Sequence, residues 1–453
     1  RMRMDFKLQI GDSSQRIEVT ATAPLLNQET AELGLAVEQN DVRQLPLNSR
    51  NFQQLALLAS GATPGIRNKD QAGGFYSHGQ HGGQNNFILD GIDNNSYVMG
   101  LQDNKAQVVV PSLDAIQEFK VETSNYSAEF GANSGAVMNV SVKSGTNRIH
   151  GTAYEYMRND KFDARGTFSY VDRNGDGKAD PEVLRQNQFG GTLGGPIRRN
   201  KTFWFGSWEG LRIRHAQSFL STVPTAQERQ GIFDPKLAVI KDPVTNQNFP
   251  GNAVPKSRWD TVAAGLADLW PAPNFTGSGT RANYVSGPPW SEGKDQVDAR
   301  LDHILSDRNK VFVRFSFGRY INARHSPLPL PARGSVGNNW GFDANTGHSL
   351  AAAYTRILSA SVFNEFRLGL PVMEADNRPL TKDHLAEKYG IKGLQTFPQV
   401  TGLPQFSFGG SVGYETLGET TGTPNWKVSK SRQFLDNLTW SRGAHALKFG
   451  TDL

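Results

Sequence analysis

The feature that most constrains the fold is an alternation of apolar and polar residues with period two, which recurs from residue 149 to the end of the chain. Alternation of this kind is typical of β-strands that present one face to an apolar environment and the other to a polar one. In "DQVDARLDHIL" (295–305), one face carries Val297, Ala299, Leu301 and His303, and the other carries Gln296, Asp298, Arg300 and Asp302.

The same pattern recurs in segments that each have about the length of a tilted membrane strand, roughly 9–11 residues. The sequence therefore predicts about nine strands in this half of the chain. Besides 295–305, they are 149–158, 186–197, 201–212, 311–320, 348–358, 361–370, 432–441 and 445–453.

The connections between these segments alternate in length. The short ones read "IRRN", "SDRN", "SA" and "RGAH", whereas the long ones span 159–185, 213–293, 321–347 and 371–431. A soluble β-sandwich normally has turns of similar length at both ends. Short turns at one end and long loops at the other are typical of outer-membrane barrels, so we predict an antiparallel transmembrane β-barrel with outer-membrane lipid as a partner.

Composition narrows the alternatives. Lys and Arg number 48 and Asp and Glu number 43, so the formal net charge is only +5, and the basic residues are scattered. We therefore predict no nucleic-acid partner. Cysteine is absent, which excludes disulfides and thiolate metal sites. The chain contains no window of 18 or more apolar residues, so the sequence predicts no membrane-spanning helix.

Residues 1 to about 147 follow a different pattern, which mixes short strands with short helices. "NSRNFQQLALLASG" (48–61) predicts a helix capped by Asn48 or Ser49, with Phe52, Leu55 and Leu58 on its apolar face. This mixture indicates a small α+β domain before the barrel.

"NNFILDGIDNN" (85–95) joins an apolar run to Asp90 and Gly91. An Asp-Gly pair accepts the positive φ angles that tight turns need, so the segment predicts a strand that enters a turn. Asp90 and Gly91 are accordingly interpreted as turn-forming structural residues.

The run 110–151 resembles the end of the plug domain of TonB-dependent outer-membrane transporters. It contains Pro111, Ile116, the strand "FKV", the turn "AEFG", and a Gly-hydrophobic-Asn-hydrophobic strand that ends at Lys143. "FILDGID" is similar to that family's central plug strand. "LPLNSRNF" and "HGTAYEYMRNDKFDA" resemble the Oar-like subgroup, in which a carboxypeptidase-regulatory-like β-domain precedes the plug.

The resemblance implies a mainly β chain, in which a small α+β plug is followed by an incomplete antiparallel transmembrane β-barrel. The expected domains are the end of an upstream β-domain or a TonB-box-like linker (1–22), the plug (23–147) and the first part of the barrel (148–453). A wide, plugged barrel needs about 22 strands, so we expect the chain to be part of a longer protein. Polar residues that face the lumen, with Arg300, Asp302 and Arg314 as candidates, are expected to hold the plug.

The resemblance also implies a function. It predicts an energy-coupled receptor and transporter in the outer membrane of a Gram-negative bacterium, with a TonB-type periplasmic protein as partner. The expected solute is too bulky for porins, such as a siderophore, cobalamin, an oligosaccharide or a peptide. Two alternatives stay open: a surface or adhesion protein built on the same plug and barrel, and a secreted calcium-binding β-protein.

"QRIEVTATAP" (15–24) is a candidate TonB box, because an extended, β-prone segment can add as a strand to a partner's sheet edge. The alternative is that it forms the closing strand of the upstream domain. The candidate partner-binding residues are Ile17, Glu18, Val19, Thr20 and Ala21.

Loops of the plug face the incoming solute in the family that the chain resembles. The residues expected there are His78, His81, Asn94 and Asn95. Two histidines without a carboxylate or a thiolate make an incomplete transition-metal site, so contact with the solute is the preferred interpretation.

"DRNGDGKAD" (172–180) matches the first half of a calcium loop. The position of the bidentate Glu holds Val183, so an Asp/Asn/Gly turn cluster is the alternative, and calcium is a possible cofactor of loop 172–183. The candidate residues are Asp172, Asn174, Asp176, Lys178 and Asp180.

Catalysis is not expected. "GGSVG" (409–413) matches the nucleophile-elbow string, but it lies in a glycine-rich loop without the strand and helix that the motif requires. The sequence therefore predicts a protein that is not an enzyme.

Overall fold

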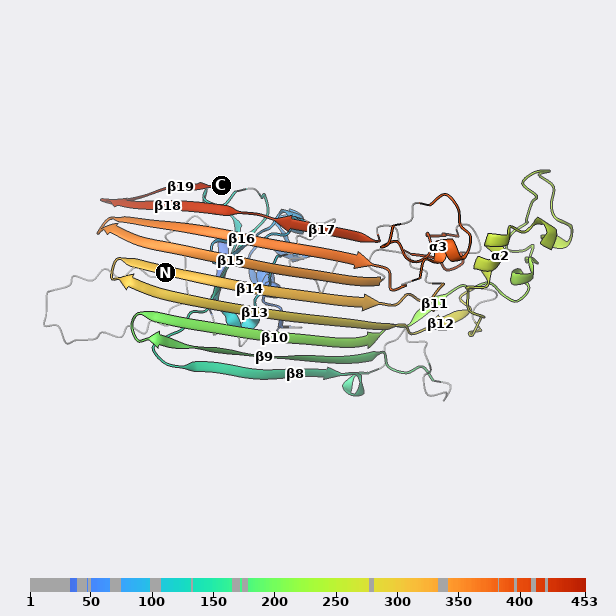
Figure 1. The fold of residues 1–453 in the computed structure, drawn as a ribbon, viewed down its shortest axis with the longest axis horizontal. Coiled ribbons are helices and arrows are strands. Elements are labelled where there is room, and N and C mark those ends of the chain that lie inside the picture. Colours follow the sequence, from blue (N-terminus) through green and yellow to red (C-terminus); the bar gives the residue numbers. More distant parts are fainter. Residues whose placement is uncertain are drawn as a thin grey trace.

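The computed structural model contains two separate main sheets, one of five strands and one of ten. We call residues 33–147 the plug and the ten-stranded sheet the wall. Figure 1 shows the plug, blue to cyan, lying against the wall. The structure describes residues 33–38, 47, 50–65, 75–97, 107–131, 133–164, 172, 178–276, 281–332, 341–381, 383–394, 397–408, 413–419 and 423–453.

The plug sheet has the order β1-β6-β7-β4-β5, with β4 and β7 parallel and the other pairs antiparallel. β2 and β3 pair separately. Short 3-10 helices connect the strands. The bounds are β1 Leu33–Glu38, η2 Phe52–Leu58, β2 Ala62–Pro64, β3 Phe75–Ser77, η3 Gly82–Gln84, β4 Asn86–Leu89, β5 Ile92–Asp93, η4 Leu113–Ala115, β6 Ile116–Ser124 and β7 Val137–Val142.

The plug has one apolar core, because its central strands bury residues in alternation or on both faces. The core also takes in Phe205 and Met373 from the wall, so the plug is packed onto the wall. Its central members are Phe52, Leu55, Phe87, Leu89, Ile116, Phe119, Val121 and Met138.

The wall is an antiparallel sheet of order β19-β18-β16-β15-β14-β13-β10-β9-β8, with β17 also paired to β16. In the described part of the chain, β8 and β19 each pair with a strand on one side only. They are therefore edge strands, and the sheet is open. The bounds are β8 His150–Asn159, β9 Val183–Arg198, β10 Thr202–Ala216, β13 Pro289–Ser306, β14 Asn309–Arg324, β15 Gly341–Ser359, β16 Val362–Arg378, β17 Asn425–Lys430, β18 Gln433–Arg442 and β19 His445–Asp452.

The two faces of the wall differ as the alternation predicts. Gln296 and Asp298 are each 1% exposed and face the plug, and we call this side the inner face. Leu301, Val313 and Phe315 lie on the opposite, outer face and keep 43–44% of their surface exposed. An apolar outer face of this kind suits contact with lipid.

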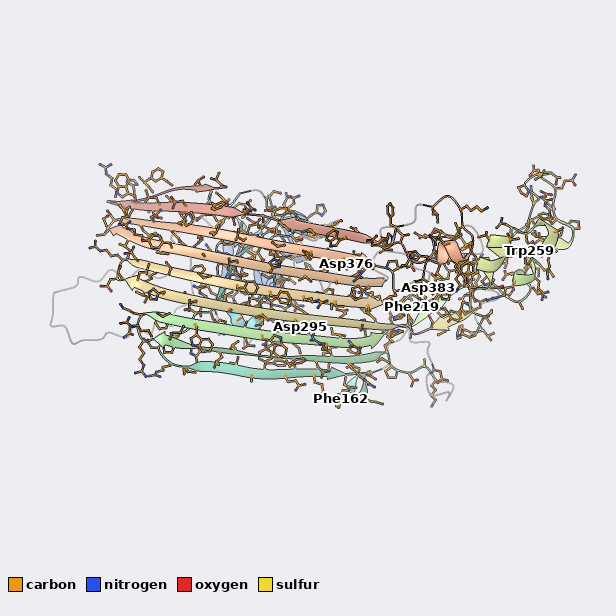
Figure 2. All side chains as sticks on the ribbon, in the orientation of Figure 1. Phe162, Phe219, Trp259, Asp295, Asp376 and Asp383 are labelled. Carbon is orange, nitrogen blue, oxygen red and sulfur yellow. The ribbon has the colours of Figure 1, made fainter. Side chains whose placement is uncertain are left out.

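The short turns lie at one end of the wall and the long connections at the other (Figure 1). Parts of the long connections 217–288, 325–332 and 379–424 share a second apolar core, and we call them the cap. Trp259 and Asp383 mark the cap beyond the strand ends in Figure 2. The core comprises Val223, Leu266, Trp270, Leu328, Ala332, Leu385, Leu403 and Leu417.

The cap contains short elements of its own. Their bounds are β11 Phe219–Ser221, η6 Glu228–Gln230, η7 Pro250–Asn252, η8 Lys256–Arg258, α2 Thr261–Ala267, β12 Tyr284–Ser286 and α3 Leu385–Lys388. One further 3-10 helix, η5 Asp160–Phe162, follows β8. In the described ranges no helix is both long and apolar enough to cross a membrane.

Three details differ from the prediction. The strands β9, β10, β13, β14, β15 and β16 have 15–19 residues and are longer than expected. β17 adds a strand inside the expected loop 371–431, because its partner β16 continues to Arg378. The helix near residue 52 is a 3-10 helix capped by Asn51, whose side chain accepts a hydrogen bond from Gln53 N. Phe52 and Leu55 are buried as predicted, whereas Leu58, the last residue of the 3-10 helix, is 60% exposed.

The expected domain boundary after residue 147 falls in the connection between β7 and β8. Residues 1–22, which were assigned to an upstream domain or linker, lie outside the described residues.

Candidate functional site at the interface of plug and wall

The turn between β4 and β5 adopts the predicted conformation. Asp90 has φ +51° and Gly91 has φ +75°, and Leu89 pairs with Ile92 across the turn. Two successive positive φ values favour an Asp-Gly pair. The turn is packed against the wall: a Cβ added to Gly91 would lie 2.0 Å from Nη1 of Arg367 on β16.

Asp90 connects the plug to the wall. Its Oδ1 accepts hydrogen bonds from the backbone N–H of Val142 (3.1 Å) and from Nη1 of Arg300 (3.0 Å). Its Oδ2 lies 2.8 Å from Nε of Arg314 in an ion pair. Arg300 Nη1 also donates to the carbonyl of Val142 at 3.0 Å. Two wall arginines therefore converge on one plug carboxylate and on the strand beside it.

Arg314 is held in place from the wall side. Its side chain is 0% exposed, and Nη1 donates to Oγ of Ser316 at 2.6 Å. Ser316 in turn donates to Oδ1 of Asp298 at 2.6 Å, and Ser207 donates to Oδ2 of Asp298 at 3.1 Å. The network fixes the direction in which the guanidinium faces the plug.

Arg300 is anchored by Asp302 on its own strand, with hydrogen bonds of 3.0–3.1 Å. Oγ of the plug residue Ser144 donates to Oδ2 of the same Asp302 at 2.7 Å. The prediction that Arg300, Asp302 and Arg314 face inward and hold the plug is confirmed by these contacts.

The cluster contains the guanidinium groups of Arg300 and Arg314 and the carboxylates of Asp90, Asp298 and Asp302. Because burial strips the charges of hydration, each depends on its partners, and removing one member of a buried pair costs about 3–5 kcal/mol. The arrangement can therefore hold the plug firmly while it is intact and weaken when Asp90 is displaced.

Glycines on the inner face allow the plug backbone to approach closely. A Cβ at Gly347 would lie 1.8 Å from the carbonyl oxygen of Val108, and a Cβ at Gly369 would lie 2.3 Å from Ile92. The wall residue Gln433 adds a polar contact, since its Oε1 accepts the backbone N–H of Asp93 at 2.8 Å.

Next to β8 the contact is looser. The guanidinium of Arg50 in the plug lies 5.0 Å and 4.1 Å from the ring centroids of Tyr154 and Tyr156, and it pairs with Asp114. A cavity of about 300 Å³ is lined by these residues together with Thr152 and Ala153.

Asn94 and Asn95 were expected to face the solute, but each is only 3% exposed. Asn94 exchanges hydrogen bonds with the backbone of Val109 through its Nδ2 (2.8 Å) and Oδ1 (3.1 Å). Oδ1 of Asn95 accepts the backbone N–H of Phe87 at 3.0 Å. Both amides hold the loop that follows β5, so they are not available to a solute in this conformation.

His78 and His81 are exposed and lie near the start of β4, away from the Asp90 turn. The backbone N–H of His78 donates to the carbonyl of Gly61 at 2.9 Å. The ring of His81 stands edge-on to Tyr76, with centroids 5.7 Å apart. Contact of the two histidines with a solute stays a prediction.

Two candidate sites fall wholly or partly outside the described residues. Ile17, Glu18, Val19, Thr20 and Ala21 lie outside them, as do Asn174 and Asp176 of the calcium-like loop. Among the residues that the structure does describe, no group of three or more His, Asp or Glu side chains is arranged to hold a metal ion. Calcium binding by this loop stays a prediction.

The sequence did not single out three contributors to the interface, Ser316, Arg367 and Gln433. All three are polar residues of wall strands that contact the plug or its partners. The alternation of apolar and polar residues could have identified Ser316 as facing the plug, because Ser316 lies two residues from Arg314 and on the same face of the strand.

Comparison with known proteins agrees with this architecture. Residues 141–453 match the family described as the outer membrane beta barrel domain. The TonB-dependent transporter Oar of Myxococcus xanthus is 25% identical over 253 residues, which cover 52% of this chain and 22% of that protein.

Two solved structures share the fold. The outer membrane transporter YddB from Escherichia coli gives a TM-score of 0.57 at 10% identity, over 93% of this chain and 48% of YddB. The siderophore receptor PirA from Acinetobacter baumannii gives a TM-score of 0.52 at 12% identity, over 93% of this chain and 47% of PirA. The chain thus spans about half the length of these proteins.

The match over residues 141–453 excludes the secreted β-protein that the sequence left open. The wall, with its inward polar network and outward apolar face, is thus the first part of a barrel of the Gram-negative outer membrane, and the chain belongs to the outer membrane beta-barrel domain family.

Proposed function

We propose that the chain is the plug and first barrel portion of an energy-coupled, TonB-dependent outer-membrane transporter. The observation that carries the proposal is the buried ion pair between Asp90 of the plug and Arg314 of the wall, with Arg300 beside it. A folded plug held by buried charges is a closed gate. The outer membrane has no energy source of its own, so opening the gate needs work supplied from the periplasm.

β1 is the strand on which a pulling force from the periplasm would act. It is the edge strand of the plug sheet and pairs with β6 alone among the described strands. A periplasmic TonB-type protein that pulls on the chain before Leu33 would load β1 first. Residues 15–24 are the proposed attachment, by addition of a strand to the partner's sheet edge.

The proposed solute is too bulky for porins: a siderophore, cobalamin, an oligosaccharide or a peptide. The names of the relatives support this class, because Oar is a TonB-dependent transporter and PirA is a siderophore receptor. One is described as a transporter and the other as a receptor, and the proposed role requires no catalysis.

The test uses the full-length protein in cells with and without TonB. Uptake of labelled ferric siderophores, cobalamin, oligosaccharides and peptides is measured, and at least one should enter only when TonB is present. Deletion of residues 15–24 should abolish that uptake while the protein stays in the outer membrane. TonB-independent uptake, or no uptake of any of the four classes, would overturn the proposal.

The cap favours a second candidate, a surface or adhesion protein. Loops that pack around a shared apolar core present a defined surface, as adhesion requires. In that case binding to cells or surfaces would survive both loss of TonB and deletion of 15–24, and it would be lost when the cap is removed.

A further inference from the structure

Two arginines face each other on the outer face of the wall. Arg185 on β9 is the direct cross-strand partner of Arg214 on β10, and both are exposed. Like charges directly opposite each other destabilise an antiparallel pair. Arg214 donates from Nη1 to the carbonyl of Ile213 at 3.0 Å, and neither guanidinium forms an ion pair with a carboxylate of the described residues.

Two carboxylates beside the ends of the neighbouring strands, Asp160 after β8 and Glu182 before β9, accept hydrogen bonds from backbone groups. Oδ1 of Asp160 accepts the backbone N–H of Leu184 at 3.2 Å. Oε1 of Glu182 accepts the backbone N–H of Ser218 at 3.1 Å. We therefore expect an anion from outside the described chain to bind between the two arginines and to reduce their repulsion.

The position of the pair indicates which anion. Along β10, the outer face carries Trp208 and then Gly210, Arg212 and Arg214 toward the long connections. Phe189 on β9 packs edge-on against Trp208, with ring centroids 5.4 Å apart. Apolar surface with aromatic residues at its margin, followed by arginines, marks the boundary between hydrocarbon and headgroups.

The neighbours of the pair suit a phosphate. Asn159 pairs with Arg185 from one side, and Ser291 pairs with Arg214 from the other, so uncharged hydrogen-bonding side chains flank the two guanidinium groups in one row. Arginine binds phosphate through two parallel hydrogen bonds, which adds direction to the charge attraction.

We propose that Arg185 and Arg214 bind the phosphate of a lipid headgroup in the outer leaflet of the outer membrane. The long connections of an outer-membrane barrel are extracellular, which places this row of residues at that leaflet. The lipid supplies the negative charge that the cross-strand pair lacks, and its acyl chains lie against the apolar surface of Phe189 and Trp208.

Other outward arginines provide matched controls, because they have carboxylate partners. Arg212 pairs with Asp295 at 2.8 Å, and Arg378 pairs with Asp376 at 2.9 Å. Figure 2 shows Asp295 and Asp376 on strands of the wall. Arg378 lies in another part of the same sheet and is already neutralised, so it should not contribute.

The test compares the full-length protein with R185A/R214A and with R378A after purification in detergent. Lipid that stays bound is identified by native mass spectrometry. Affinity is then measured for bis-phosphorylated lipid A, for its dephosphorylated form and for inorganic phosphate. Heat-modified migration on gels, which reports a folded barrel, verifies folding of each variant.

We expect the wild type and R378A to bind lipid A alike, and R185A/R214A to bind it at least about tenfold more weakly, as loss of charge-assisted hydrogen bonds predicts. R185K/R214K should recover part of the affinity. Equal binding by R185A/R214A, or equal binding of the dephosphorylated lipid, would overturn the proposal. So would inorganic phosphate that binds as tightly as the lipid, since the site would then be one for small anions.

Discussion

Asp90, at the turn that ends plug strand β4, and Arg314, on wall strand β14, form an ion pair of 2.8 Å in which the arginine side chain is completely buried. A buried guanidinium has lost its hydration and depends on its carboxylate partner. The position of the plug is therefore linked to one turn residue, and the wall holds Arg314 through hydrogen bonds that join it to Ser316 and Asp298.

Replacement of Asp90 by Asn should loosen the plug. The amide keeps the shape of the side chain but leaves Arg314 and Arg300 without the plug carboxylate, at an expected loss of about 3–5 kcal/mol. Denaturant unfolding of the full-length protein, and entry of antibiotics that porins exclude, measure the effect. Asp295→Asn is the control, because its ion pair is more than a third exposed and should contribute no more than about 1 kcal/mol. Equal effects of the two substitutions would contradict the role of Asp90.

Gly91 should accept a side chain only if the guanidinium of Arg367 moves. Gly91→Ala combines a strained φ of +75° with a Cβ that would meet Arg367. Gly443, in a short turn of the wall, has φ +61° and no heavy atom within 4 Å of an added Cβ. Gly443→Ala should cost about 1–2 kcal/mol for the backbone alone, and Gly91→Ala should cost more, because the end of the Arg367 side chain must also move. Melting temperatures of the two variants check this, and a larger shift for Gly443→Ala would refute the close packing of the turn.

Asn94 should act as a structural residue. Asn94→Ala leaves the buried N–H and C=O of Val109 without the partners seen in the structure, which should cost about 1–3 kcal/mol for each unsatisfied group. Asn364→Ala is the comparison, since that amide bonds Asp436 at an exposed position and its loss should change stability little. If Asn94→Ala instead reduced solute affinity without changing stability, Asn94 would belong to a solute site after all.

The cap should have an acid-sensitive part. Arg258 donates two hydrogen bonds to Asp242, and this interaction lowers the pKa of the Asp242 carboxyl below its ordinary value. A carboxyl with a lowered pKa stabilises the fold above its ordinary pKa of about 3.9, and that contribution is lost as the pH falls through the lowered value. The protection of residues 232–258 against amide exchange, relative to the intrinsic rate at each pH, should show a step down below about pH 4 in the wild type. In Asp242→Asn the exchange should show no such step, and an unchanged step would assign it to another group.

The sequence predicted the inner and outer faces of the wall well, because alternation depends only on residues two apart and the pleat places them on one side. The same pattern predicted that Arg300 and Arg314 lie on the inner face. The Asp90-Gly91 turn was equally local, since the required positive φ values limit which residues can occupy it. The sequence was less informative about Asn94 and Asn95, because asparagine occurs both in exposed loops and as a buried, hydrogen-bonded side chain.

The amino-acid sequence by itself determined the strands, their faces and the tight turn. Only the tertiary structure decided that Asp90 meets Arg300, 210 positions away, and that β17 extends the wall. It also brought Arg185 opposite Arg214. The physical reason is that alternation and turn conformation are local properties of the chain, whereas these pairings depend on strand register and on how the plug lies against the wall, which no short segment specifies.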